Sequence, residues 1–157
     1  MQELLDHVHL SGLVRLIRSE EFPGMPESVS LARKFIRSVC KGIGVDLDSA
    51  VLLVSEAATN AVVHAGSPFR VTVVALVGRP PWIEVQDRSP ERPKRRVASS
   101  EDDSGRGLEL LDALSVSWHT DVDKASGNKI ICFTPKGDQN ESGTEADPAS
   151  GLTALAS

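Results

Sequence analysis

The sequence has few aromatic residues, no excess of basic residues and no long hydrophobic run. Tyr is absent, and Phe and Trp together make up 4% of the 157 residues, too few for the stacking platforms that bind single-stranded nucleic acid. Lys and Arg number 17 against 22 Asp and Glu, so the net charge of −5 argues against a general nucleic-acid binder. No apolar run reaches the roughly 20 residues that cross a bilayer, and the acidic, mixed N-terminus is unlike a secretory signal.

Cysteine is also scarce. Cys40 and Cys132 lie far apart, each within an apolar pattern, and neither has the spacing of a zinc or redox motif. These absences predict a reduced, cytoplasmic protein that contacts neither a membrane nor nucleic acid directly. The remaining composition, 40% hydrophobic and 25% charged, is that of a globular chain long enough to bury a core without disulfides.

Composition divides the chain into three segments. Residues 1–12 are weakly patterned and form an N-terminal extension. Residues 13–135 carry the periodic apolar patterns of a folded domain. Residues 136–157 are small, polar and acidic, so we expect a disordered tail.

Hydrophobic periodicity predicts strands and helices within residues 13–135. Alternation with a period of two predicts strands at 13–22, 69–77, 82–87, 115–120 and 129–133. Spacings of three and four predict helices at about 28–43, 46–64 and 107–114. This order predicts an α+β two-layer sandwich, with the helices on one face of a mixed, mainly antiparallel sheet.

A polar seam follows the second predicted helix. Glu56, Asn60 and His64 are spaced i, i+4 and i+8, beside an arc of Ala and Val that we expect to pack on the sheet. A carboxylate one turn from a carboxamide suits Mg²⁺ and can also orient a nucleophile. The alternative is a solvated helix face, but the seam lacks the Lys and Arg that such faces usually carry.

Two further segments carry polar groups at the ends of predicted elements. Asp87 ends a hydrophobic strand, where a carboxylate can accept a hydrogen bond from the amine of a buried base; the alternative is a turn-initiating Asp. Gly105-Arg106-Gly107 precedes a helix, which leaves backbone N–H groups and a cation for phosphate, unless it is only a hinge. Between them lies a long charged loop, 88–104, of a length often found at functional sites. Together these features predict a nucleotide held between a helix layer and a mobile lid.

These segments resemble the GHKL ATPase superfamily, and more narrowly the RsbW-like anti-sigma factors of the actinobacterial type, which are serine-protein kinases. The resemblance spans about residues 13–133. It is carried by EAATNAVVHA at 56–65, by SGRGLELLDAL at 104–114 and by FPGMPESVSLARKFIRSV at 22–39.

The resemblance implies a role for each residue of the predicted site. Asn60 would coordinate the Mg²⁺ that bridges the phosphates of ATP, Glu56 would be the general base, and Asp87 would bind the adenine amino group. The lid over the phosphates would be lined by Gly105, Arg106, Gly107 and Leu108. His64 would have a supporting role or would be a packed, hydrogen-bonded histidine.

The sequence departs from the family pattern at two places. Asp87 is followed by Arg-Ser-Pro-Glu with no glycine, and Ile130 stands where a late strand often has a Thr that supports the adenine site. There is also no helical module with a phosphoacceptor histidine, since His7 and His9 are only two residues apart. A sensor histidine kinase is therefore not indicated.

The function implied by the resemblance is regulatory. An ATP- and Mg²⁺-dependent anti-sigma factor would sequester a sigma factor and phosphorylate an anti-anti-sigma (STAS-domain) protein on Ser or Thr. A homodimer is among the assemblies that the resemblance implies. The alternative is a non-catalytic GHKL-like binding module that acts by sequestration alone.

Overall fold

The computed structural model describes residues 13–88 and 106–138, with the backbone alone for residues 106 and 107. The N-terminal extension, most of the charged loop and nearly all of the predicted tail lie outside the described residues. The strands are β1 (Val14–Phe22), β2 (Phe69–Leu76), β3 (Trp82–Asp87), β4 (Ser115–Val122) and β5 (Lys129–Pro135). The helices are α2 (Glu27–Val39), α3 (Leu47–Asn60), a π-helical turn η1 (Ala61–Ala65) and α4 (Arg106–Leu114).

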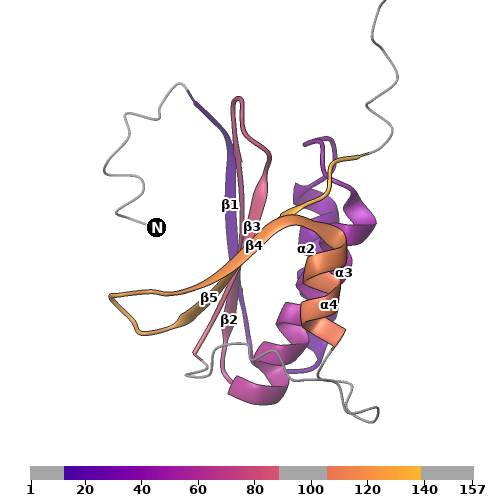
Figure 1. Cartoon of the computed structure of the whole chain (residues 1–157). Coiled ribbons are helices and arrows are strands. Elements are labelled where there is room, and N and C mark those ends of the chain that lie inside the picture. Colours follow the sequence, from indigo (N-terminus) through magenta and orange to yellow (C-terminus); the bar gives the residue numbers. More distant parts are fainter. Residues whose placement is uncertain (1–12, 89–105, 139–157) are drawn as a thin grey trace, which may run out of the picture.

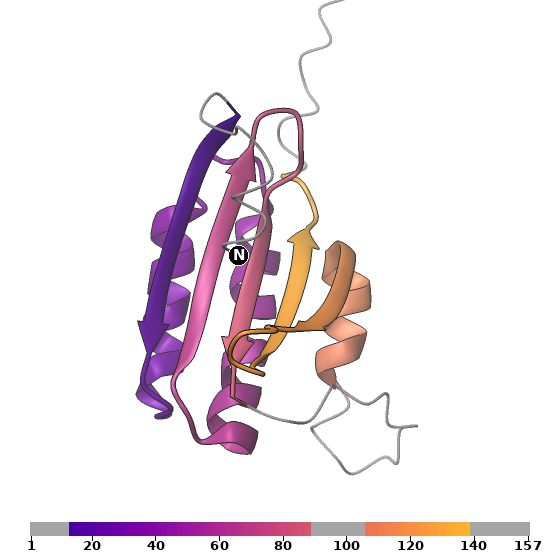
Figure 2. The ribbon, with the colours of Figure 1, turned by 90° about the vertical axis from the view of Figure 1, so that its left-hand side faces the viewer.

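The strands form one sheet with helices on a single face. The strand order is β1-β2-β3-β5-β4, and Figure 1 shows α2, α3 and α4 together on one side of it. Figure 2 looks onto the opposite face, which none of these helices covers. The predicted α+β two-layer sandwich is confirmed. Every pairing among the described strands is antiparallel, so the parallel component expected of a mixed sheet is not seen in this part of the chain.

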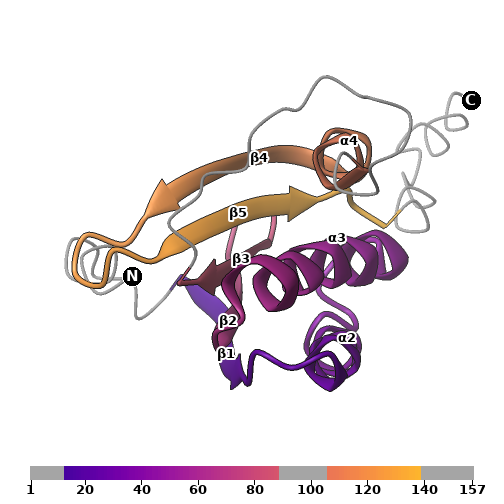
Figure 3. The same cartoon turned by 90° about the horizontal axis from the view of Figure 1, so that it is seen from below.

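The core lies between the sheet and α3, the central helix of its layer (Figure 3). Most of the arc of small apolar residues predicted along α3 and η1 is buried, including Val54, Ala58 and Ala61, each fully enclosed, whereas Val62 and Ala65 are half-buried. Alternate residues of β2, β3 and β5 meet it from the sheet, because successive strand side chains point to opposite faces. Helix α2 adds Ala32 and Ile36 to the same core, as its apolar spacing predicts.

Helix α3 has a capped start and an unusual end. The side chain of Asp46 accepts a hydrogen bond from the backbone N–H of Ser49 at 3.1 Å, which is an N-cap. At the other end the helix widens into the π turn and stops at Gly66, whose φ of 54° is left-handed and suits glycine. Single π turns inside helices occur often at functional sites.

The chain after β5 is tied to the start of α3. The backbone N–H of Asp46 donates to the carbonyl of Lys136 at 2.9 Å, and Val45 forms an isolated bridge with Gly137. These bonds extend the ordered backbone past the strand and fix the N-terminal end of α3 against the sheet.

Both cysteines are packed as the apolar pattern predicts. Burial raises the pKa of the Cys40 thiol to about 11. Burial, and then the nearby Glu84 carboxylate, raise the pKa of the Cys132 thiol to about 12. Both thiols therefore stay protonated near neutral pH and are poor nucleophiles. No helix among the described residues is long and apolar enough to span a membrane.

A close backbone approach joins the loop after β1 to the loop after η1. A Cβ placed on Gly24 would lie 2.6 Å from the carbonyl oxygen of Ser67, too close for any side chain. We expect Gly24→Ala to reduce the free energy of unfolding by about 1–3 kcal/mol, because the two loops must separate to admit the methyl group. Urea unfolding followed by circular dichroism measures this loss.

Gly137→Ala is the matched control, because its Cβ would make only an ordinary 3.7 Å contact with the Gly44 carbonyl oxygen. It should change stability by less than about 0.5 kcal/mol. Equal losses in the two variants would show that the loop contact does not constrain the fold.

Candidate functional site

Several elements that carry predicted site residues end at the same end of the molecule. Strand β3 runs down to this end, α3 passes into η1 there, and α4 begins there (Figures 1 and 2). Strand β5 begins beside the end of β3, since Asp87 pairs with Lys129 in the antiparallel register. Helix α3 packs against α4 and also touches β3 and β5. The fold thus places the polar seam, the strand-end Asp and the start of α4 around one end of α3.

Glu56 and Asn60 lie one turn apart on α3, and both are half-buried. Their helix is held by the buried apolar arc on its other side, so their backbone positions are rigid. Within the described part of the chain, neither side chain makes a hydrogen bond or ion pair. A carboxylate and a carboxamide oxygen therefore stand side by side, able to bind a cation or a hydroxyl group.

His64 differs from its two predicted neighbours on the seam. It lies in η1, where the helix winds with i→i+5 hydrogen bonds, shown by the Gly66 N–H donating to the Ala61 carbonyl at 3.1 Å. The wider turn breaks the 3.6-residue period after Asn60, and His64 is exposed. The interpretation of His64 as a packed histidine is therefore wrong.

Asp87 is deeply buried and forms an ion pair that sequence reasoning missed. Its Oδ2 atom lies 3.2 Å from Nζ of Lys129, and the two side chains are only 3% and 9% exposed. The two residues face each other across β3 and β5, on the face of the sheet that carries the helices. The cross-strand register is the signal that could have found Lys129, but a single sequence does not reveal the register of two strands separated by 41 positions.

The register also corrects the expectation for Ile130. Ile130 pairs with Gln86, not with Asp87. Because strand side chains alternate, Ile130 points to the face of the sheet away from Asp87. Lys129, rather than Ile130, is the β5 residue beside the predicted base-binding carboxylate.

The predicted lid is described only in part. Gly105 lies outside the described residues, and for Arg106 and Gly107 the structure gives the backbone at the start of α4. Leu108 is half-buried and packs against the core cluster. Its side chain therefore anchors the first turn of α4 to the domain.

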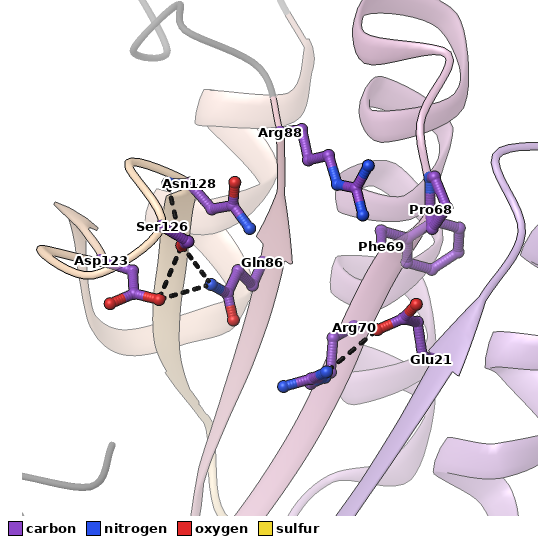
Figure 4. Close-up of a pocket in the computed structure, with 9 residues that line it drawn as sticks. All are labelled: Glu21, Pro68, Phe69, Arg70, Gln86, Arg88, Asp123, Ser126 and Asn128. Carbon is purple, nitrogen blue, oxygen red and sulfur yellow. Dashed lines mark hydrogen bonds and ion pairs between the residues drawn. The ribbon is translucent and has the colours of Figure 1, made fainter.

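A polar hollow of about 220 Å³ opens at the same end of the sheet (Figure 4). None of Glu56, Asn60 and Asp87 lines it. Three of its charged side chains already have partners. Arg70 forms an ion pair with Glu21 at 3.0 Å, and Asp123 accepts hydrogen bonds from the neutral side chains of Gln86 and Ser126. The hydrogen bond from the Ser126 hydroxyl, followed by that from the Ala125 backbone N–H, lowers the pKa of Asp123. We assign no ligand to this hollow.

The donor set on α3 fits a phosphate-bound magnesium ion better than a protein-only metal site. Among residues 13–88 and 106–138, no three His, Cys, Asp or Glu side chains gather closely enough to hold a metal. Asn60 and Glu56 offer three oxygen atoms at most, whereas Mg²⁺ takes six ligands, and phosphate and water often complete the set. The seam therefore fits Mg²⁺ that arrives with a polyphosphate.

Comparison with known families agrees with this geometry. The model of the histidine kinase-like ATPase domain matches residues 22–134, which include β2, β3 and β4, all but the last residue of β5, and all of the helices. The chain belongs to this family, and so to the GHKL superfamily. Comparison with the curated proteins gave no match.

The buried ion pair makes a sharp stability prediction. Lys129→Met leaves the Asp87 carboxylate buried beside an apolar side chain, and we expect a loss of about 3–5 kcal/mol in the free energy of unfolding. Lys124→Met is the control, since Lys124 is exposed in the β4–β5 turn and should contribute less than about 0.5 kcal/mol. Denaturant unfolding at neutral pH measures both. A loss below about 1 kcal/mol for Lys129→Met would mean that the Asp87 carboxylate is compensated without Lys129.

Proposed function

We propose that this protein is an ATP-binding anti-sigma factor. It sequesters a sigma factor and phosphorylates an anti-anti-sigma (STAS-domain) protein on Ser or Thr, in a partner-switching system in the cytoplasm. The observation that carries the proposal is the half-buried Glu56–Asn60 pair on the helix that packs against α4, within a histidine kinase-like ATPase domain. A domain that only scaffolds other proteins has no need of such a pair on this helix.

The proposed chemistry is in-line phosphoryl transfer, in which positioning and charge neutralisation supply most of the catalysis. Mg²⁺ would neutralise charge on the phosphates as the γ-phosphoryl group leaves. The Asn60 carboxamide oxygen would hold the cation at a fixed position beside α3. The Glu56 carboxylate would orient the acceptor hydroxyl and take its proton.

The proposed partners are proteins. The net charge of −5 suits docking to proteins rather than to DNA. A sigma factor and a STAS-domain protein would compete for the domain, and nucleotide state would set the outcome. A homodimer is part of the same proposal, because the resemblance to RsbW-like anti-sigma factors implies this assembly.

The alternative proposal is a non-catalytic binding module. Two observations favour it. No glycine follows Asp87, and the Asp87 carboxylate is already engaged by Lys129. Retention of both Glu56 and Asn60 favours the kinase, since sequestration alone has no use for a general base.

Nucleotide binding is the first test. Titration calorimetry with Mg-ATP should show binding to the wild type, and Asn60→Ala should weaken it about 10- to 100-fold, the effect of losing an interaction with a charged group. Thr59→Ala is the matched control, because the exposed Thr59 hydroxyl donates only to the Ser55 carbonyl of its own helix at 2.8 Å. If the folded wild-type protein does not bind Mg-ATP at millimolar concentration, the kinase proposal fails. The function that remains is sequestration without nucleotide.

Phosphotransfer is the second test. With radiolabelled ATP and a panel of STAS-domain proteins as acceptors, Glu56→Gln should lower the transfer rate about 10²- to 10⁴-fold, the usual contribution of a general base. Its affinity for Mg-ATP should stay close to that of the wild type, since the amide keeps the shape of the side chain. Transfer by Glu56→Gln at the wild-type rate would refute the base assignment. ATP binding by wild type without transfer to any acceptor would favour the non-catalytic module.

A further inference from the structure

The outer side of α2 carries a cluster of cations in a chain whose net charge is −5. Between residues 28 and 45 there are four basic residues and no Asp or Glu. All four are exposed, whereas the residues of α2 that face the core, Ala32 and Ile36 among them, are buried. We call these four the basic face: Arg33, Lys34, Arg37 and Lys41.

The basic face has little counter-charge within residues 13–88 and 106–138. Arg37 approaches Asp48 at 3.7 Å, but the two side chains are 54% and 91% exposed, so water and salt screen the contact. Nε of Arg33 donates to the hydroxyl of Ser55, which is neutral. The other two cations make no hydrogen bond or ion pair with the described part of the chain. Four exposed cations thus have one weak ion-pair partner there.

The sequence beyond the described residues has the opposite charge. The acidic segment, residues 139–157, has no Lys or Arg and three carboxylates: Glu141, Glu145 and Asp147. It begins close to the end of α2, because the backbone N–H of Asp138 donates to the carbonyl of Gly44 at 3.4 Å. Figure 1 shows the described chain leaving β5 at the end of the molecule where α2 ends. Gly44 is only three residues beyond Lys41, so the acidic segment and the basic face are neighbours.

The acidic segment is long enough to reach every cation of the basic face. A helix rises roughly 1.5 Å per residue, so the basic face is about 12 Å long. Residues 139–147, which contain all three carboxylates, span at most about 30 Å when extended. The tether gives the carboxylates an effective concentration on the order of millimolar beside α2. Exposed ion pairs too weak to join two separate molecules can therefore form within one chain.

We propose that the acidic segment docks on the basic face of α2 in the same chain. The contact is electrostatic and reversible, with the carboxylates lying along the row of cations. Any other acidic ligand of α2 must displace the segment first, so the chain carries its own competitor for this surface. The inference does not depend on the proposed nucleotide chemistry, because the basic face contains none of the candidate site residues.

Paramagnetic relaxation in the whole chain tests this contact. A nitroxide attached at Thr144→Cys, between two of the carboxylates, broadens the amide signals of residues that it approaches. Burial raises the pKa of the Cys40 and Cys132 thiols, so both compete poorly for the label, and wild type treated with the same reagent gives the background.

We expect broadened amides across residues 33–41 at about 0.05 M salt and an effect at least twofold weaker at about 0.5 M, where charges are more strongly screened. Broadening that is equal at both salt concentrations, or absent from α2, would overturn the inference.

Charge variants separate docking from the effect of the tether alone. Lys34→Gln combined with Lys41→Gln should weaken the broadening of α2 at least twofold, because two of its four cations are removed. Arg88→Gln combined with Lys124→Gln is the matched control, since it removes two exposed positive charges outside α2 and should leave the broadening unchanged. The same loss in both pairs, or no loss in either, would contradict docking on the basic face.

A second experiment identifies which chain supplies the acidic segment. Nitroxide-labelled chain without isotope enrichment is mixed with unlabelled chain enriched in heavy nitrogen, so that only contacts between two chains broaden the signals. We expect no broadening of α2 in this mixture. Broadening there would assign the segment to a second copy and overturn the intramolecular contact. Melting temperatures confirm that each variant is folded.

Discussion

The packing of α3 against the sheet is the contact on which the other features of this protein depend. The helix buries an arc of Ala and Val, and its small side chains bring the backbone close to β3 and β5. That contact fixes the rotation of the helix about its axis. As a result, Glu56 and Asn60 are held half-buried, without hydrogen bonds or ion pairs of their own among the described residues. The N-cap at Asp46 and the π turn before Gly66 set where the rigid part begins and ends.

The sheet supplies the second half of the candidate site, the Asp87–Lys129 pair. Its position is fixed by the pairing of two strands rather than by helix packing. Antiparallel pairing of β3 with β5 sets Asp87 directly opposite Lys129, and burial makes each charge dependent on the other. The carboxylate expected to bind the base is present, and it is already paired with an ammonium group. The proposed phosphate side of the site is built on α3, and the proposed base side is built on β3 and β5. The two sides can therefore be tested separately.

Much of this arrangement was predictable because it follows local periodicity. The bounds of β3 and the buried arc of α3 agree with the apolar patterns that predict them, and so does the α+β sandwich. The interpretation of His64 as a packed histidine was wrong because it assumed a uniform 3.6-residue helix, and hydrophobic patterns do not report a π turn. The expectation for Ile130 was wrong because it needed the register between β3 and β5, two strands that lie far apart in the sequence.

The amino-acid sequence by itself determined the element order, the polar pair on α3 and the absence of features typical of nucleic-acid binders. Each of these depends on residues within a few positions of one another, or on composition. Only the tertiary structure decided which side chain stands beside Asp87, because hydrogen bonds between distant strands choose the register. It also decided that Gly24 has no room for a Cβ atom, because the backbone of Ser67 approaches it closely. Both outcomes arise from contacts between distant segments, whose geometry is settled only when the whole core packs.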